Sequence, residues 1–206
     1  TRENNLESRR LFEAAMALDP QFAAAHAAAS WTYFRGWVLQ WEPGPETFAH
    51  AQELALKAVK LDPGLPNAHE ILASTHLWQK DHAKARQAAE TAIKVGPNSA
   101  NAYRTLADIH KFSGNPTAAI EAVEQARRRN PSDAWLHSWD LGHSHLLLGE
   151  LDKAVAALEE FVAGNPNFLP AYAYLGVAYL ELGRDDEARA ATGKALETSP
   201  GLTIER

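Results

Sequence analysis

Residues 167–200 read NFLPAYAYLGVAYLELGRDDEARAATGKALETSP, and this stretch decides the fold. Its first half places apolar residues at helical spacing, as in Leu175 and Tyr179, which lie four residues apart. Gly183 follows as a turn signal, because glycine takes the positive φ that ends a helix. A second amphipathic helix then runs to Pro200, which cannot continue it. The stretch therefore predicts two antiparallel helices joined by a tight turn.

The same pattern recurs along the chain, and the prolines that close each unit mark its period. They follow one another at steps of 43, 34, 34, 35 and 34 residues: Pro20, Pro63, Pro97, Pro131, Pro166 and Pro200. A small residue recurs in the middle of the first helix of each pair, at Ala73, Ala107, Gly142 and Gly176. Small side chains let two helices approach closely. Each pair buries only one face by itself, so neighbouring pairs must stack.

This spacing resembles that of the tetratricopeptide repeat family, in which W-x2-L-G-x2-Y is followed by A-x3-F and a closing proline. The last repeat fits best, with Tyr172, Leu175, Gly176, Tyr179, Ala188 and Pro200. The resemblance covers essentially the whole chain. It implies an all-α fold, a right-handed superhelical solenoid of antiparallel helix pairs.

We expect a single array over residues 1–206, divided at the closing prolines. The predicted parts are a half repeat at 1–20, repeats at 21–63, 64–97, 98–131, 132–166 and 167–200, and the truncated start of a further helix at 201–206. Arrays of this kind normally end in a polar capping helix, and none is evident in the sequence. We therefore expect apolar surface at one or both ends, and self-association through these uncapped ends.

The first full repeat is lengthened by an insertion at about residues 35–48. We interpret it as a longer first helix followed by a Pro-Gly-Pro loop. Its Trp37 and Trp41 either pack on the neighbouring helix pair or form a lip of the binding surface. Gly36-Trp37 and the tail at 200–206 resemble the repeat region of bacterial adenylate/guanylate cyclase-like proteins and winged-helix regulators. This weaker resemblance implies a bacterial, cytoplasmic regulatory module. The chain has no initiator methionine, so we expect it to be a fragment of a longer chain.

Composition narrows the class of function. The chain has 206 residues, of which 46% are hydrophobic and 22% charged, as in folded proteins. Its net charge of -6 gives no general attraction for a phosphate backbone, so we expect no nucleic acid partner. No apolar run approaches about 18 residues, so we expect no membrane insertion. The absence of cysteine excludes disulfides, cysteine-ligated zinc and cysteine nucleophiles.

Histidines are the residues best able to carry chemistry in this sequence. His76, His110 and His145 occupy the slot that holds tyrosine in the family pattern. Equivalent slots of a solenoid lie about 10 Å apart, whereas metal ligands converge within about 2 Å of one ion. We therefore interpret these histidines as packing residues with a hydrogen bond. No nucleophile motif or Gly-rich phosphate loop is present, and we expect no metal, no cofactor and no enzymatic activity.

The first helix of each pair lines a concave groove in tetratricopeptide arrays, and the resemblance implies which slots face it. The slots with aromatic or charged side chains that we expect to bind a partner are Trp31, Phe34, Arg35, Glu70, Trp78, Arg104, Asp108, Lys111, Phe112, Trp139 and His143. Exposed aromatic side chains in a concavity are typical binding anchors. Alternatively, some rings pack across to the next repeat and the charges pair with one another. The chaperone-binding members of the family hold a C-terminal carboxylate with a clamp of lysine and asparagine side chains. The slots of those asparagines contain other residues here, so we do not expect a receptor for chaperone tails: Glu70, Ser74, Arg104 and Asp108.

These observations predict a non-enzymatic protein–protein interaction scaffold that binds a peptide or partner segment in an aromatic-lined concave groove. The alternative is a homotypic oligomerisation module of a larger bacterial signalling or regulatory protein. A small ligand enclosed by the insertion is a third interpretation.

Overall fold

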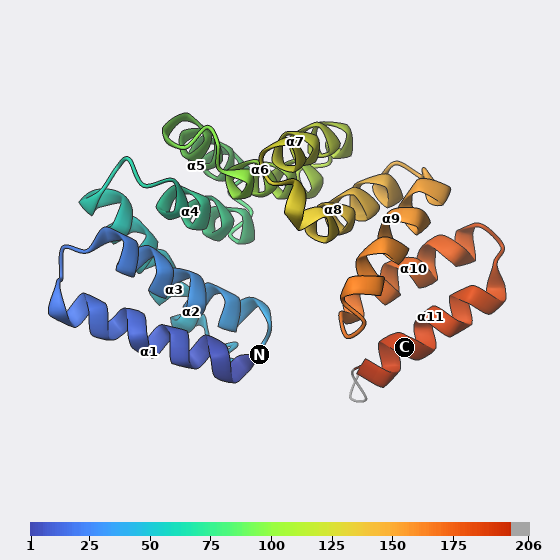
Figure 1. Ribbon diagram of the computed structural model, residues 1–206, viewed down its shortest axis with the longest axis horizontal. Helices are drawn as coiled ribbons and strands as arrows, with labels where there is room; N and C mark the ends of the chain where they lie inside the picture. The colour runs from blue at the N-terminus through green and yellow to red at the C-terminus, as the bar shows by residue number, and fades with distance from the viewer. Residues whose placement is uncertain (199–206) are drawn as a thin grey trace. The chain divides into compact units, whose positions relative to one another are not determined.

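The computed structural model describes residues 1–198, except the side chains of residues 133, 134 and 198. This part of the chain is helical and contains no strand, so the all-α fold class is confirmed (Figure 1). Its elements are α1 (Arg2–Leu18), α2 (Ala23–Val38), α3 (Pro45–Leu61), α4 (Pro66–Trp78), α5 (His82–Val95), α6 (Ala100–Phe112), α7 (Pro116–Arg129), the 3-10 helix η1 (Pro131–Asp133), α8 (Ala134–Leu147), α9 (Leu151–Gly164), α10 (Leu169–Glu181) and α11 (Asp185–Thr198). The helix start expected at 201–206 lies outside the described residues. The chain divides into two compact units, Thr1–Ile109 and His110–Arg206, which are described separately as unit 1 and unit 2.

Unit 1 is built from the helix pairs α2 with α3 and α4 with α5, and α1 packs on α2 ahead of them. Its core is dominated by alanines with no exposed surface, among them Ala27, Ala55, Ala58 and Ala68. Side chains this small let the helices approach closely, and Ile71 fills space among them. Ser30 Oγ donates a 2.5 Å hydrogen bond to the Ala51 carbonyl. This bond joins α2 to α3 at the small-residue slot of the pattern.

The turns inside the helix pairs have the backbone conformation that the sequence predicts. Gly183, between α10 and α11, has a φ of 72°, in the left-handed region that glycine adopts without steric cost. The corresponding turn between α4 and α5 has no glycine, and Lys80 takes this conformation with a φ of 61°. Asp81 then caps α5 by accepting a 3.1 Å hydrogen bond from the Lys84 amide.

Around the predicted insertion, α2 runs to Val38 and a tight loop follows. Residues 39–44 lead to α3. The loop folds back on α2, because the amides of Trp41 and Glu42 both donate to the Gly36 carbonyl, at 2.9 and 3.1 Å. Pro45 begins α3 at a position where no amide hydrogen is needed.

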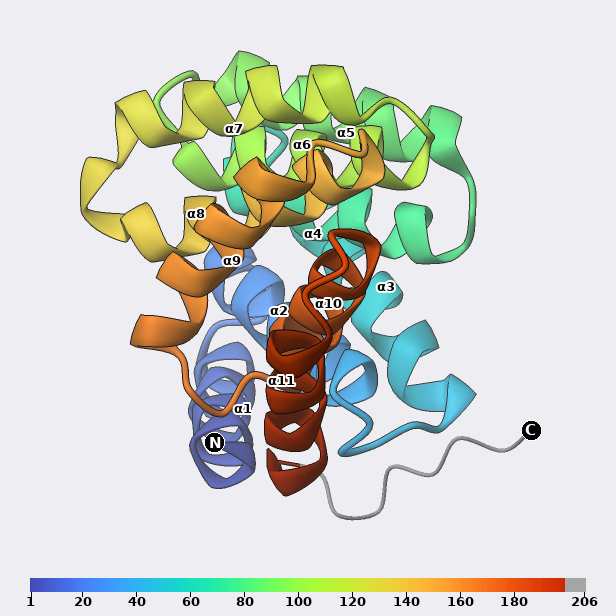
Figure 2. The same ribbon diagram turned by 90° about the vertical axis from the view of Figure 1, so that its right-hand side faces the viewer.

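Unit 2 contains the pairs α8 with α9 and α10 with α11, and Figure 2 shows α10 and α11 side by side. Its core uses larger side chains than that of unit 1, including Val155, Leu158, Phe161, Leu175 and Tyr179. The position of Leu158 explains why the small-residue slot of this repeat contains glycine, Gly142. A Cβ atom on Gly142 would lie 2.6 Å from Leu158 Cγ, a distance that real side chains do not reach. Glycine is therefore required for α8 and α9 to pack this closely.

Two repeats keep the tyrosine of the pattern, and both tyrosines make the same contact. Tyr33 Oη donates to Glu13 Oε1 and Tyr179 Oη donates to Glu159 Oε1, each at 2.5 Å. Burial and the neighbouring carboxylate raise the pKa of both tyrosines to about 12. In each case the bond joins the first helix of one pair to the last helix of the preceding repeat.

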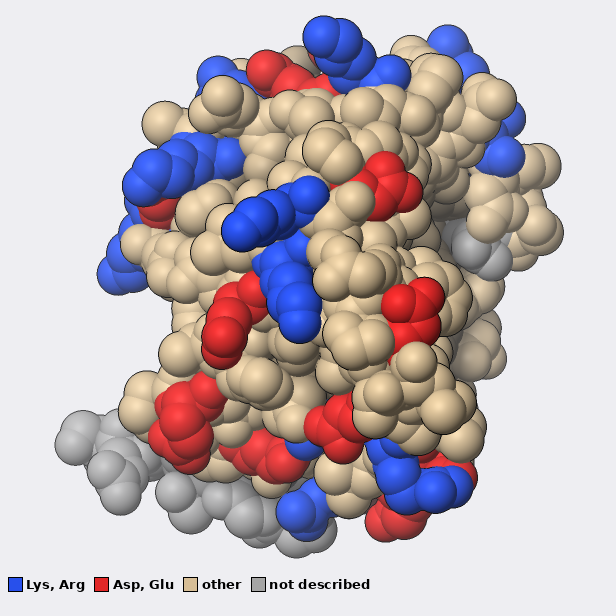
Figure 3. All heavy atoms as spheres, turned by 90° about the vertical axis from the view of Figure 1, so that its left-hand side faces the viewer, with Lys and Arg blue, Asp and Glu red and all other residues tan. Residues whose placement is uncertain are grey.

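Charged side chains of both signs are interspersed on the face of the molecule that Figure 3 shows. Several exposed charges pair three residues apart on one helix, as in Lys84 with Asp81 at 2.8 Å and Arg10 with Glu7 at 2.7 Å. Exposed pairs of this kind contribute roughly 0–1 kcal/mol each. The stability of the fold must therefore come mainly from the packed helix faces.

Candidate partner-binding surfaces

The residues predicted to line one groove fall in both units and differ widely in exposure. The exposed ones are Trp31, Arg35, Trp78 and Phe112. The partly buried ones are Arg104, Asp108 and Trp139. The buried ones are Phe34, Glu70, Lys111 and His143. We define the α2–α4 surface of unit 1 as Trp31, Arg35 and Trp78, and the α8 surface of unit 2 as Phe112, Trp139, His143 and Tyr174.

Helix geometry explains why some predicted slots are buried. Two consecutive residues after the tyrosine slot were both expected to face a partner, yet successive residues on a helix point about 100° apart. The second residue is exposed in every repeat, at Arg35, Trp78, Phe112, Leu147 and Glu181. The first is buried in the first three repeats, at Phe34, Leu77 and Lys111. In the first three repeats the outward position is therefore the second of the two, whereas in α10 both Leu180 and Glu181 are exposed.

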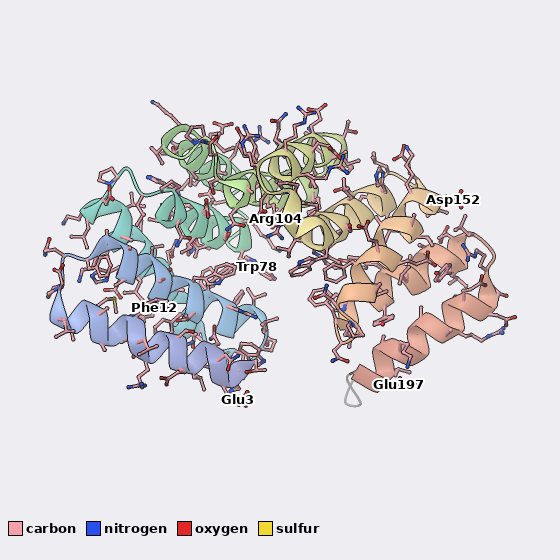
Figure 4. The ribbon with its side chains drawn as sticks, in the orientation of Figure 1. Glu3, Phe12, Trp78, Arg104, Asp152 and Glu197 are labelled. Carbon is pink, nitrogen blue, oxygen red and sulfur yellow. The ribbon has the colours of Figure 1, made fainter. Side chains whose placement is uncertain are left out.

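Two half-exposed tryptophans of the α2–α4 surface are held by other aromatic rings. Trp78 lies at the end of α4 (Figure 4). It meets Trp37 edge to face with ring centroids 5.3 Å apart. Trp31 lies on α2, with its ring centroid 5.8 Å from that of Phe34. Rings supported in this way lose little side-chain entropy when a partner covers them. Their exposed faces are therefore preorganised for contact.

The insertion supplies rings beneath this surface that were not among the predicted site residues. Trp37 packs on Phe48 of α3, with centroids 4.7 Å apart, as well as on Trp78 of the next helix pair. Trp41 lies beneath the Arg35 guanidinium, 5.8 Å from it. Trp37 thus packs on the neighbouring pair, as in the first of the two alternatives for the insertion. Trp37 follows Phe34 by three residues on α2. This spacing is the sequence signal that places the two rings next to each other on one face of the helix.

A buried polar cluster ties the insertion to α1. Arg9 donates to both carboxylate oxygens of Glu42, at 2.9 and 2.6 Å, in the bidentate geometry that suits a guanidinium. Arg9 and Asn5 also donate to the Thr32 carbonyl, at 3.1 and 2.9 Å. The guanidinium holds the pKa of Glu42 below its usual value. No local pattern reveals this cluster, because Arg9 and Glu42 are 33 residues apart in the chain.

Glu70 was expected to set charge on the surface of unit 1, but its carboxylate lies inside the protein. It accepts a 2.6 Å hydrogen bond from Ser99 Oγ, just ahead of α6. Burial raises the pKa of Glu70. The residue therefore links α4 to the next repeat instead of presenting a charge to a partner.

Lys111 was also expected at the surface, and it forms an internal ion pair instead. Its Nζ lies 2.8 Å from Asp140 Oδ1 of α8, and each side chain is only 1% exposed. Removing one charge from water costs several kcal/mol, so a lysine in this slot requires an opposite charge beside it. Asp140 was not among the predicted site residues. The feature of the sequence that could have revealed Asp140 is that this acidic residue stands between two apolar residues, Trp139 and Leu141.

The rings of the α8 surface form a continuous cluster. Trp139 stacks on Tyr174 with planes 3° apart and centroids separated by 5.3 Å. The Tyr174 ring lies 4.6 Å from the His143 ring, and Phe112 meets His143 edge to face at 5.9 Å. Trp139 and His143 are four residues apart on α8 and so share one face. Tyr174 comes from α10 and was not among the predicted site residues. The prediction treated each repeat separately, so it did not show which rings of different repeats are in contact.

His143 lies between two more exposed rings and carries no charge at neutral pH. Its ring centroid is 5.9 Å from that of Phe112 and 6.0 Å from that of Trp139. Burial, together with the positive charge of Lys111, lowers the pKa of His143 to about 4. Burial also raises the pKa of Tyr174, so its hydroxyl keeps its proton and remains a hydrogen-bond donor.

The histidines that replace the tyrosine of the pattern make local contacts. His145 Nδ1 lies 2.6 Å from Glu150 Oε2, and His76 Nδ1 lies 3.4 Å from Gln79 Oε1. Among the side chains that the structure describes, no three His, Asp or Glu residues are grouped so that they could hold a metal ion. In the same part of the chain, no helix combines the length and the apolar character needed to cross a membrane.

Comparison with known proteins places the repeats in a family. The tetratricopeptide repeat family matches residues 104–167 and 140–202. Putative adenylate cyclase 3 of Rhizobium meliloti (strain 1021) is 32% identical over 78 residues, which are 37% of this chain and 13% of that protein. The chain therefore corresponds to a small part of the length of this relative.

Solved structures of repeat proteins have the same fold. TTC0263, a thermophilic tetratricopeptide repeat protein of Thermus thermophilus, is 28% identical, with a TM-score of 0.69 over 84% of this chain and 93% of that chain. The Cut9–Hcn1 complex of the APC/C matches with a TM-score of 0.82 at 17% identity, over 97% of this chain and 38% of that chain. The family match identifies residues 104–202 as tetratricopeptide repeats, whose fold is that of a protein–protein interaction scaffold. The helix pairs and these structures show the same fold.

Proposed function

We propose that this chain is a non-enzymatic scaffold that binds an extended or helical segment of a partner protein through exposed aromatic side chains. The observation that carries the proposal is the pair Trp31 and Trp78. Their side chains are 46% and 49% exposed, although each is held by a second aromatic ring. Tryptophans with a fixed position and a free face are the residues that most often dominate interface energies.

The surroundings of these tryptophans indicate the chemistry of the partner segment. Arg35 lies one helical turn after Trp31 on α2 and is exposed. Glu70, the acidic slot of the same unit, is buried and hydrogen-bonded to Ser99. A segment with apolar anchors and an acidic residue beside them therefore suits the α2–α4 surface, with the charge adding selectivity more than affinity.

The test is a selection of peptides from a random library on the immobilised 206-residue chain, followed by fluorescence-anisotropy titration of the selected peptides. The Trp31→Ala, Trp78→Ala double variant should weaken their binding by at least about tenfold, since each lost anchor typically costs more than about 1 kcal/mol. Leu56→Ala is the matched control, because Leu56 is 51% exposed on α3 and lies outside the surface. Undiminished affinity in a double variant with native far-UV circular dichroism would overturn the proposal.

Homotypic association is a second candidate, and α1 provides the observation that favours it. Leu11 and Leu18 are 54% and 89% exposed and lie seven residues apart, on one face of the helix. A second copy of the chain that covers this face would bring two larger regulatory proteins together. Sedimentation equilibrium checks it: the chain should dimerise, and Leu11→Glu with Leu18→Glu should give a monomer. A monomeric unmodified chain at high concentration would exclude this candidate.

A further inference from the structure

The α8 surface is arranged for a narrow apolar ligand. His143 is buried, and the rings of Phe112 and Trp139 lie 5.9 and 6.0 Å from it. The Phe112 side chain is 58% exposed. A ligand side chain seated over His143 would therefore touch an aromatic ring on either side.

Two hydrogen-bond donors on this surface have no acceptor among the groups that the structure describes. They are the indole nitrogen of Trp139 and the hydroxyl of Tyr174, neither of which is sequestered from solvent. Both side chains are partly buried, and their rings stack on one another. Tryptophan and tyrosine commonly place an apolar ring against a partner and donate a hydrogen bond from its polar tip. The backbone carbonyls of a bound segment are the acceptors that such donors suit.

Asp140 and His143 place no exposed charge on this surface. Asp140 is buried against Lys111 at 2.8 Å, and His143 is neutral at neutral pH. A charged ligand group, or many amide hydrogens, would lose water here without a matching partner. A proline-rich segment avoids this cost. Proline has a carbonyl and no amide hydrogen, and a polyproline II backbone makes no internal hydrogen bonds.

We infer that the α8 surface binds a proline-rich segment of a partner protein in the polyproline II conformation. Proline rings would pack over His143, between Phe112 and Trp139, and two backbone carbonyls would accept from Trp139 and Tyr174. The segment loses little entropy on binding, because its conformation is already formed in solution. This inference rests on the proposed function and names the class of partner for unit 2.

The experiment titrates fluorescein-labelled decaproline with the 206-residue chain and compares it with a glycine–serine peptide of the same length. Decaproline should bind and the glycine–serine peptide should not. Tyr174→Phe and Trp139→Phe each remove one donor and keep the ring, so each should weaken binding by about 3- to 10-fold. Tyr172→Phe, on the same helix as Tyr174 but outside the α8 surface, is the matched control and should leave decaproline binding unchanged. The indole 15N–1H signal that Trp139→Phe removes should shift on addition of decaproline.

The outcomes separate this inference from the proposed function. Library peptides that depend on Trp31 and Trp78, together with no binding of decaproline, would overturn the inference and leave the proposed function standing. Failure of both decaproline and the library peptides to bind would overturn both. Equal binding of decaproline and the glycine–serine peptide, or decaproline binding that neither Tyr174→Phe nor Trp139→Phe weakens, would also overturn the inference. Circular dichroism confirms that these conservative variants are folded.

Discussion

The α2–α4 surface of unit 1 and the α8 surface of unit 2 present similar rings on different supports. Trp78 and Phe112 occupy the same slot of successive repeats, and both are about half exposed. The residue before each is buried, but it is Leu77 in unit 1 and Lys111 in unit 2. Leucine satisfies this slot by packing alone, whereas lysine needs Asp140 from the next first helix. The comparison teaches that one slot can hold apolar or ionic contacts while the outward residue stays aromatic.

The largest effect is expected from breaking the ion pair on which this difference depends. Lys111→Met should lower the free energy of unfolding by about 3–5 kcal/mol, because it leaves the Asp140 carboxylate buried without its counter-charge. Adding Asp140→Leu should regain stability, since two apolar side chains can pack in place of the pair. Urea denaturation followed by far-UV circular dichroism measures both.

Leu77→Met is the matched control in unit 1, because it changes the shape of the side chain in the same slot without changing charge. It should cost less than about 1.5 kcal/mol. If Lys111→Met costs no more than Leu77→Met, the two slots are equivalent and the ionic support of the α8 surface is unimportant.

A second prediction compares the tryptophans of the two surfaces. Trp139 contacts the rings of His143, Phe161, Phe168 and Tyr174, whereas in the described part of the chain Trp31 contacts the ring of Phe34 alone. Trp139→Ala should therefore lower the free energy of unfolding by about 3–5 kcal/mol, the range for large core side chains. Trp31→Ala should cost about 1 kcal/mol or less, as expected for a surface side chain. Thermal or urea unfolding that gave equal losses would show that the two rings have the same role.

The smallest expected effect is a pH dependence that belongs to unit 2. The pKa of His143 is lowered from its usual 6.5 to about 4, so between these pH values the unfolded chain binds a proton that the folded chain does not. Stability is therefore fully present above pH 6.5 and falls as the pH drops towards 4, by about 2–3 kcal/mol. In unit 1, the lowered pKa of Glu42 reduces stability only around and below its usual value of 4.5. The raised pKa of Glu70 has the opposite sign, because the folded chain then binds a proton that the unfolded chain has lost. Unfolding curves recorded across this range test the difference.

His143→Phe keeps an aromatic ring in place and removes the titrating group. The fall in stability between pH 6.5 and 4 should become shallower in this variant. An unchanged slope would mean that other groups cause the pH dependence.

Most of the fold could be predicted because its determinants are local. Gly183 and Pro45 stand at a turn and at a helix start, where their backbone preferences act within a few residues. Gly142 marks a close approach of two helices, and its slot recurs in each repeat. The candidate surfaces were predicted less well. Lys111 pairs with Asp140 across 29 residues, and such a contact leaves no periodic trace in the sequence.

The sequence by itself determined the helix pairs, their period, the turns between the helices and the aromatic side chains that the first helices carry. It did so because spacing, small residues and prolines act over one or two helical turns. The tertiary structure alone decided which of those side chains face outward. It placed Lys111 and Glu70 inside, brought Tyr174 of α10 against Trp139 of α8, and set Trp37 beneath Trp78. These outcomes depend on how neighbouring helices rotate and pack, and packing joins residues that are far apart in the chain.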